Sequence, residues 1–379
     1  DASRQGHSGG EITRESAGAE THATAASVVE SRHRQGEIWA SSDDGLVHVT
    51  RDDGKSWTNV TPPGLPPLAY IGCVEISAHD ADTVYLAATR YKLQDYRPHL
   101  YRSTDSGRSW QSINGDFPTD QITRVIRADT VRKGLLFVGT ETGIFFSLDD
   151  GKSWSRSQGG LPVVPVYDLK IKGADLVAAT HGRSFWILDD ISPLRLLADG
   201  SRATRLVPPR ETVRSRLHFG ALANVRGDVS SMVVFGIEGG IATVERPDGI
   251  RLRHHLDIGE NPPFGVIVYY WLDEATKAPV ELTFSDAAGK RIVAFRSDDT
   301  ALAAARRPAT KPGLNRFVWD MRYPGAAKID PALLVRRVKP LAADPEGQPG
   351  PLAVPGRYKV AFKAGETMAT ADFTIGWFS

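Results

Sequence analysis

The chain has 379 residues, of which 41% are apolar and 24% are charged, which is ordinary for a globular protein with room for two or three domains. Its 46 basic and 45 acidic residues leave a formal net charge of +1, so the charge favours neither nucleic acid nor an anionic membrane as a partner. Cys73 is the only cysteine, which excludes an intrachain disulfide and a cysteine-based metal site. No apolar run approaches the roughly 20 residues that span a bilayer.

The first residues, "DASRQGHSGG", include no initiator methionine, so we expect a fragment or a processed product of a longer protein. The chain also has no phosphate loop, dinucleotide fingerprint or "HExxH" motif. We therefore expect neither a metal nor a cofactor.

An octapeptide is repeated along the first half of the chain. It occurs as "TRDDGKSW" at residues 50–57, "STDSGRSW" at 103–110 and "SLDDGKSW" at 147–154. A degenerate fourth copy is expected where residues 179–191 align with residues 139–151, matching Phe145 with Phe185 and Asp149 with Asp189. A period of about 40 to 50 residues, made of short segments rich in Val, Ile, Thr and aromatic residues, predicts β-propeller blades of four antiparallel strands.

Each octapeptide is predicted to form the turn between the third and fourth strands of a blade. Its aspartate would accept hydrogen bonds within the turn, its glycine would adopt a positive φ, and its tryptophan would be buried between sheets. These structural residues are Asp52, Gly54, Trp57, Asp105, Gly107, Trp110, Asp149, Gly151 and Trp154. The repeat therefore predicts a folding role rather than catalysis.

The pattern Ser/Thr-x-Asp-x-Gly-x-x-Trp resembles the Asp-box, or bacterial neuraminidase (BNR) repeat, of sialidases, xyloglucanases and sortilin-type receptors. The stretches "GEIWASSDDGLVHVTRDDGKSWTNVTP" and "LVAATHGRSFWILDDISPLRLL" look like exported bacterial proteins of the sortilin-like or "glycosyl hydrolase" type. The resemblance implies an all-β fold and a periplasmic or extracellular location. The catalytic residues of sialidases and xyloglucanases cannot be assigned to positions in this chain, because the surrounding motifs do not match.

The fold class we expect is all-β, in three segments. Residues 1–197 would form about four propeller blades, part of a larger ring whose earlier blades lie outside this chain, because an open ring exposes strand edges. A closed four-bladed ring is the alternative. Residues 198–262 would be a connector and irregular region, and residues 263–379 an immunoglobulin-like β-sandwich with Trp319 in its core. A short helix is expected at residues 330–338.

Candidate site residues lie in the loops between the second and third strands of the blades, because these loops emerge on the face opposite the octapeptide turns. Besides the candidates named next, these loops contain Arg97 and Asp44. The binding candidates are Arg90, Tyr91, Tyr96, His181 and Arg183. The carboxylates that could serve catalysis are Asp43, Asp95 and Glu141.

Two functions stay open from the sequence. The first is an exported sortilin-like propeller that binds a protein, peptide or glycan through this loop face. The alternative is a glycoside hydrolase, sialidase- or xyloglucanase-like, that uses a pair of loop carboxylates. The expected partners are accordingly such a ligand and the earlier blades of the same protein.

Overall fold

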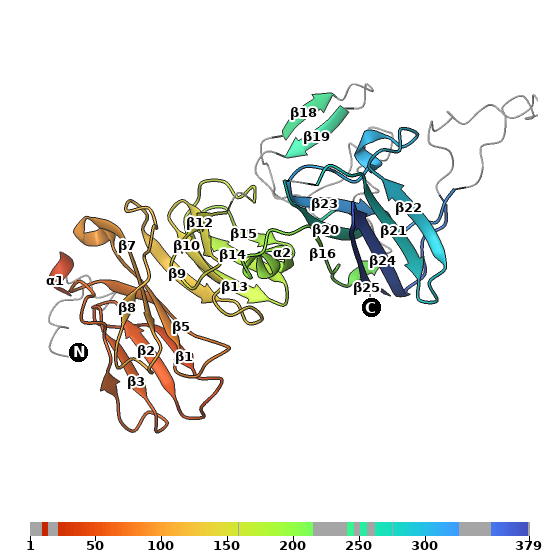
Figure 1. Cartoon of the computed structure of the whole chain (residues 1–379). Coiled ribbons are helices and arrows are strands. Elements are labelled where there is room, and N and C mark those ends of the chain that lie inside the picture. Colours follow the sequence, from red (N-terminus) through yellow and green to blue (C-terminus); the bar gives the residue numbers. More distant parts are fainter. Residues whose placement is uncertain are drawn as a thin grey trace, which may run out of the picture. The chain divides into compact units, whose positions relative to one another are not determined.

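A computed structural model describes residues 10–13, 22–157, 159–214, 241–245, 251–255, 262–274, 276–325 and 350–377 (Figure 1). The chain divides into two compact units, residues 1–201 and 202–379. The regular elements of the described residues are mostly β-strands, with short α-helices α1 (Gly10–Thr13) and α2 (Ser192–Leu197). No helix in these ranges is long and apolar enough to cross a membrane.

The first unit consists of consecutive antiparallel sheets whose strand order follows the chain. The first sheet holds β1 (Ala25–Glu30), β2 (Ile38–Ser42), β3 (Val47–Thr50) and β4 (Thr58–Asn59). The second holds β5 (Tyr70–Ile76), β6 (Val84–Arg90), β7 (Asp95–Ser103) and β8 (Gln111–Ser112). The third holds β9 (Thr123–Ala128), β10 (Leu136–Thr140), β11 (Gly143–Ser147) and β12 (Ser155–Arg156). The fourth has three strands, β13 (Val166–Lys172), β14 (Asp175–Thr180) and β15 (Phe185–Leu188), and is followed by α2.

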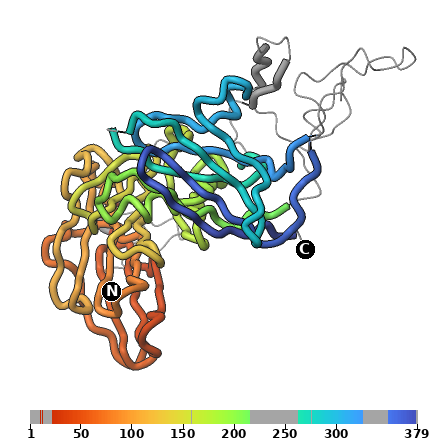
Figure 2. The backbone as a smooth tube through the Cα atoms, turned by 45° about the vertical axis from the view of Figure 1, so that its right-hand side comes forward, coloured from red at the N-terminus to blue at the C-terminus, as the bar shows by residue number. Residues whose placement is uncertain are grey.

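Neighbouring sheets of this unit contact each other through their first and second strands. The first strands of neighbouring sheets are in contact, in the pairs β1·β5, β5·β9 and β9·β13. The second strand of each sheet also contacts the first strand of the next sheet, in the pairs β2·β5, β6·β9 and β10·β13. Figure 1 labels strands of these sheets, and Figure 2 traces their backbone from red through orange and yellow to green in chain order. Meandering four-stranded sheets that pack face to face with their first strands together are β-propeller blades.

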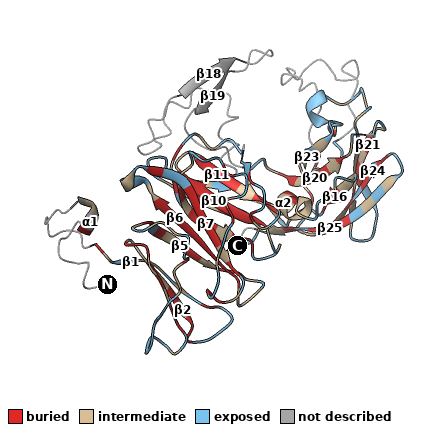
Figure 3. Ribbon diagram, turned by 60° about the vertical axis from the view of Figure 1, so that its left-hand side comes forward, coloured by how far each residue is buried: buried red, intermediate tan, exposed pale blue. Residues whose placement is uncertain are grey.

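The core of the first unit lies between these sheets, and Figure 3 shows the burial concentrated on strands such as β5, β6 and β10. Trp39 is fully buried between the first and second sheets. Phe137 and Leu136 are fully buried in a second cluster that extends to the fourth sheet. Strands such as β10, in which every residue is buried, are therefore covered on both faces.

The two outermost sheets each have an open face. Val28 on β1 is 64% exposed and Phe185 on β15 is 73% exposed. A closed four-bladed ring would bury both side chains between the first and fourth sheets. The alternative of a closed four-bladed ring is therefore wrong for the described residues.

The three octapeptide turns have one geometry. In each, the aspartate accepts hydrogen bonds from the backbone N–H and the hydroxyl of the serine four residues later, at 2.9 Å and 2.6–2.7 Å. The Thr or Ser two residues before it donates to the same carboxylate at 2.7–2.8 Å. Gly54, Gly107 and Gly151 have φ values of 86°, 83° and 82°. All three carboxylates are thus used within their own turns.

The tryptophans of the three turns differ in burial. Trp154 is 8% exposed and Trp110 is half-buried, but Trp57 is 45% exposed. The expectation that Trp57 is buried between sheets is wrong for the described residues, because no described sheet precedes the first one.

The fourth sheet departs from the expected alignment by one residue. Phe145 pairs with Val138 in the third sheet, and the equivalent Ala178 of the fourth sheet pairs with Trp186. The structural counterpart of Phe145 is therefore Trp186 rather than Phe185. The cause is one extra residue in the turn: two residues separate Thr140 from its partner Gly143, whereas three separate Thr180 from Ser184, whose carbonyl accepts the Thr180 N–H at 3.1 Å.

The second unit has two sheets that share a core. One has the order β16 (Arg205–Val207), β20 (Val266–Leu272), β23 (Gly313–Trp319). The other has the order β17 (Thr212–Arg214), β25 (Thr367–Trp377), β24 (Gly356–Ala364), β21 (Val280–Asp286), β22 (Arg291–Arg296). Trp319 and Phe284 are fully buried between them, with ring centroids 4.6 Å apart.

Two strands of this unit, β16 and β17, come from the segment expected to be a connector. The same segment contains the hairpin β18 (Ile241–Glu245) and β19 (Arg251–His255). The helix expected at residues 330–338 lies outside the described residues. Two short 3₁₀ helices, η2 (Tyr91–Leu93) and η3 (Ala304–Arg306), complete the described elements.

Candidate functional site

A β-bulge recurs at the same place in all four sheets of the first unit. The register between the first and second strands shifts between Ala25 and Ser27 in β1 and between Tyr70 and Cys73 in β5. It shifts again opposite Gly139 and Thr140 in β9, and between Val166 and Asp168 in β13. A bulge re-aims the side chain of the extra residue. In β9 and β13 the extra residues are Arg124 and Tyr167.

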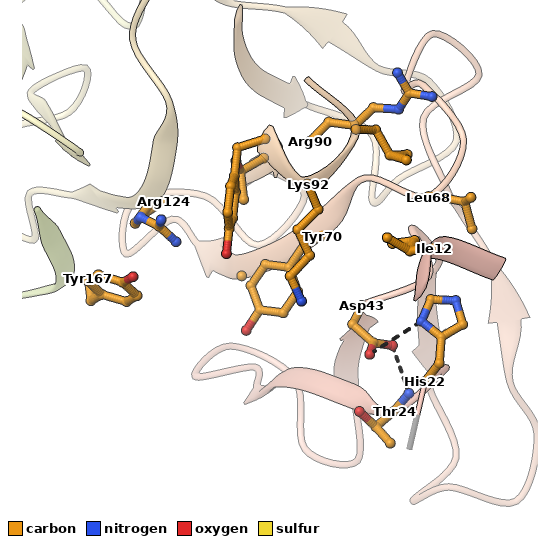
Figure 4. A pocket seen from close by; sticks show the side chains of 14 residues that line it. Ile12, His22, Thr24, Asp43, Leu68, Tyr70, Arg90, Lys92, Arg124 and Tyr167 are labelled. Carbon is orange, nitrogen blue, oxygen red and sulfur yellow. Dashed lines mark hydrogen bonds and ion pairs between the residues drawn. The ribbon is translucent and has the colours of Figure 1, made fainter. Parts of the chain in front are cut away.

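These re-aimed side chains line a pocket of about 510 Å³ (Figure 4). Its wall also contains Tyr70 at the start of β5, Asp43 from the loop after β2, and the end of β6 with the following η2 turn. The volume and the mixture of aromatic faces with a few polar groups are typical of ligand sites. The pocket therefore lies where the first strands begin and the loops between second and third strands meet.

Arg124 is the centre of one wall. Its guanidinium carbon lies 4.2 Å from the ring centroid of Tyr167 and 5.1 Å from that of Tyr91. Glu141 from the loop between β10 and β11 forms an ion pair with it. His181, in turn, packs its ring against Tyr167 with 5.1 Å between the centroids. The cation between two tyrosine rings gives this wall a fixed geometry.

The opposite wall carries an acid. The Asp43 carboxylate accepts a hydrogen bond from the Thr24 backbone N–H at 2.8 Å, and its other oxygen lies 3.7 Å from Nδ1 of His22 (Figure 4). His22 is buried, whereas Asp43 is half-buried and faces the pocket. Asp43 is thus the one carboxylate in the described lining.

The structure brings some of the sequence candidates together and not others. Asp43, Arg90 and Tyr91 line the pocket. Arg90 is held by a hydrogen bond from its Nε to the Pro67 carbonyl at 2.9 Å. Glu141 does not line the pocket but forms an ion pair with Arg124, which does.

Asp95 is not part of the lining. Arg97 donates to both of its carboxylate oxygens, at 2.8 and 2.9 Å, and His99 lies 3.3 Å away. The hydrogen bonds from Arg97 hold the pKa of Asp95 well below its usual range. Burial lowers the pKa of His99. A carboxylate in such a cluster positions a loop and makes a poor general acid.

The remaining candidates lie at the surface or in structural contacts. Tyr96 is 52% exposed and outside the lining. The Arg183 backbone N–H donates to Thr180 Oγ1 at 3.2 Å, and the Arg183 carbonyl accepts from the Trp186 indole at 2.9 Å. Asp44 is buried and accepts a hydrogen bond from the Ser42 hydroxyl.

The lining residues missed from the sequence include His22, Tyr70, Arg124 and Tyr167. Their common signal is position, because each stands within three residues of the start of a first strand. The connection that leads into a first strand emerges on the same face as the loops between second and third strands. The candidates from the sequence all lie in the loops predicted between second and third strands.

No group of three or more His, Cys, Asp or Glu side chains that could hold a metal occurs in the part of the chain that the structure describes. The pocket accordingly offers hydrogen bonding, aromatic contact and one carboxylate.

The comparisons with curated proteins give partial matches to xyloglucanases. The chain is 27% identical over 111 residues to the oligoxyloglucan-reducing end-specific xyloglucanase of Emericella nidulans, which covers 28% of this chain and 14% of the relative. It is 28% identical over 141 residues to a probable enzyme of the same name from Neosartorya fischeri, covering 37% of this chain and 17% of the relative. The chain thus spans less than a fifth of these relatives. No protein-family model matches it.

Solved structures also overlap with parts of the chain. The GH74 xyloglucanase from Xanthomonas campestris has a TM-score of 0.37 and 17% identity, covering 50% of this chain and 32% of the enzyme. YCF48 bound to D1 peptide has a TM-score of 0.34 and 18% identity, covering 44% of this chain and 51% of that protein.

Proposed function

We propose that the first unit binds a glycan in the pocket between Arg124 and Asp43, as part of a glycoside-hydrolase-like β-propeller. The observation that carries this proposal is the arrangement of the wall. Tyr70 and Tyr167 present aromatic surface beside the Arg124 guanidinium, across from a half-buried carboxylate. Aromatic faces cover the C–H face of a sugar ring, while charged groups hydrogen-bond its hydroxyls. The ligand expected from the sequence was a protein, a peptide or a glycan.

The partial similarity to xyloglucanases supports a glycan over a peptide and favours glycoside hydrolysis as the activity that such a pocket serves. Hydrolysis uses two carboxyl groups, about 5 to 9.5 Å apart. Asp43 would be one of them. Glu141 is engaged by Arg124 and Asp95 by Arg97, so in this second candidate function the other carboxyl group comes from a residue beyond the described lining.

Titration calorimetry of the full chain with xyloglucan oligosaccharides and a panel of other glycans tests the binding proposal. Tyr167→Ala should weaken binding about tenfold or more, because it removes an aromatic face worth about 1–2 kcal/mol. Tyr96→Ala is the matched control and should leave the affinity unchanged, since Tyr96 lies outside the lining. Binding of no glycan, or equal effects of the two substitutions, would contradict the proposal.

Reducing-end release from the same glycans tests the second candidate. Asp43→Asn should abolish hydrolysis while leaving binding within about threefold, because the amide keeps the shape and the hydrogen bond from Thr24. A chain that binds but releases no product would support binding alone.

We also propose the finer assignments implied by the sequence resemblance. The octapeptide turns are of the Asp-box type, and their shared hydrogen bonds support this. The protein is sortilin-like and exported to the periplasm or the extracellular space. The two sheets of the second unit, with their common core, support an immunoglobulin-like sandwich.

A further inference from the structure

The octapeptide tryptophans make a repeated contact with the sheet that precedes them. The Trp110 indole N–H donates to the Val60 carbonyl at 2.7 Å, and the Trp154 indole N–H donates to the Ile113 carbonyl at 2.9 Å. Both acceptors directly follow the fourth strand of the preceding sheet. Each indole also packs on an aromatic ring, Trp110 on Trp39 of β2 and Trp154 on Phe117 in the connection that follows β8. The contact is therefore a standard joint between two blades.

A second position of the repeat is buried at the same joints. Val74 on β5 pairs with Leu86, and Ile126 on β9 pairs with Val138. Both Val74 and Ile126 have no exposed surface. Each lies in the first strand, on the side that faces the preceding sheet. The joint thus combines one aliphatic side chain with one tryptophan.

The first sheet carries the same two side chains with no described sheet packed against them. Val28 on β1 pairs with Ala40, as Val74 pairs with Leu86, and it is 64% exposed. Trp57 is 45% exposed, and its indole has no hydrogen-bond partner among the described residues. Val28 and Trp57 repeat, residue for residue, the Val74 and Trp110 pair that the first sheet covers. Exposed apolar pairs of this kind mark interaction surfaces.

We propose that the face formed by Val28 and Trp57, here the docking face, receives a further four-stranded blade of the same repeat type. The backbone carbonyl directly after the fourth strand of that blade accepts the Trp57 indole N–H, as the Val60 carbonyl accepts that of Trp110. The interface continues a series of joints that the first unit already contains.

The occupant is a complete blade rather than the open end of a second copy of this chain. That open end is the fourth sheet, where the chain passes from β15 into α2 and no fourth strand forms. It lacks the strand end whose carbonyl receives the tryptophan in the other joints. The exposed residues of that end, Phe185 and Ile187, lie on the third strand β15 and do not match the strand end that receives the tryptophan in the other joints.

The docked blade would extend the pocket. In every joint of the unit the first strands of the two blades lie in contact. A blade on the docking face therefore places the start of its own first strand beside β1, next to Thr24 in the pocket wall. This consequence holds whatever ligand the pocket takes.

The chain itself supplies a probe for the docking face. A copy of residues 22–69 is joined to Thr24 of the chain, which lies four residues before Val28 as Tyr70 lies four residues before Val74, so that the natural junction between Ala69 and Tyr70 is reproduced. The copy presents the same face that Val74 and Trp110 already occupy. Hydrogen–deuterium exchange of β1 and of the second octapeptide turn then reports on the new joint and on an existing one.

In the extended protein the β1 amides should exchange about tenfold or more slowly than in the original chain. Trp57→Ala at the original position should reverse this protection, yet change exchange less than about twofold in the unextended chain. Trp110→Ala is the matched control and should accelerate exchange around its own joint in both proteins.

Failure of either the copy or β1 to gain protection overturns the proposal, because the copied face is one that accepts this Val and Trp pair. Sedimentation of the unextended chain gives the second check. A dimer that Trp57→Ala abolishes would make a second copy the occupant and would overturn the assignment to a blade.

Discussion

At the scale of single residues, the aspartates of the octapeptide turns are tuned by short local contacts. The hydrogen bond from Ser56 lowers the pKa of Asp52 to about 2, and that from Ser109 lowers the pKa of Asp105 to about 2. Burial opposes the shift at Asp149, yet the hydrogen bonds from Ser153 and its neighbours still lower that pKa. These carboxylates stabilise the fold only while they are ionised.

The turns should therefore contribute, together with Asp95, to the loss of stability of the first unit in acid. A carboxyl group whose pKa is lower in the folded than in the unfolded state adds stability above the unfolded value of 3.8, and this stability is lost as the pH falls toward about 2. We expect the urea midpoint of unfolding to fall steeply between those limits. Ser109→Ala should raise the pKa of Asp105 toward 3.8, measured by carboxyl NMR, whereas Ser112→Ala should not. An unchanged Asp105 titration in Ser109→Ala would contradict this account.

The turns were predictable because every partner of the aspartate lies within the same eight residues. The burial of the tryptophans was not, because it depends on the sheet that precedes each one. Trp57, Trp110 and Trp154 stand in equivalent local sequences and differ in exposure. Local sequence thus determines the bend of the chain, and tertiary packing determines what the indole contacts.

At the scale of elements, the structure contains a second repeated feature, a histidine that links one sheet to the next. His33 and His79 stand two residues after Ser31 and Ser77, which directly follow β1 and β5. The ring Nε2 of His33 bonds the Ser77 carbonyl of the next sheet at 2.8 Å, and that of His79 bonds the Asp129 carbonyl at 3.0 Å. Each histidine links its sheet to the following one at equivalent places.

The link from His79 can be tested against a histidine without that role. His79→Ala should destabilise the contact between the second and third sheets by about 1 kcal/mol, the net value of one hydrogen bond. Faster amide exchange in β9 would report the loss. His181→Ala is the control, because its exposed ring joins no two sheets, and it should leave β9 unchanged. Equal exchange in the two variants would show that the His79 contact contributes nothing.

The pocket was predictable in part, for a reason that lies in the strands. Asp43, Arg90 and Tyr91 stand in the loops that topology brings to one face, so sequence order alone gathers them. Arg124 and Tyr167 reach the pocket because a bulge interrupts the alternation of their strands. If side chains simply alternated between the two faces of the strand, neither residue would be expected to point into the pocket. A bulge leaves no clear signal in a single sequence.

At the scale of the molecule, the chain has two units with separate cores. The core clusters of the first unit draw only on residues before 202, and that of the second only on residues after 202. From the sequence we expected three segments, with the blades ending at residue 197 and a connector over residues 198–262. Separate cores imply that the two units lose their structure in separate cooperative steps.

Calorimetry of the full chain should accordingly resolve two unfolding transitions. Trp154→Ala should lower the midpoint of one by roughly 10 °C, because removing a buried aromatic side chain costs about 3–5 kcal/mol and each kcal/mol shifts a unit of this size by about 2–4 °C. Phe284→Ala should lower the other by a similar amount, since its ring is fully buried in the second core. If either substitution moved both transitions together, the units would share stability through an interface, and their cores would not be independent. Two independent shifts would instead mean that the second unit keeps its fold whatever happens to the blades.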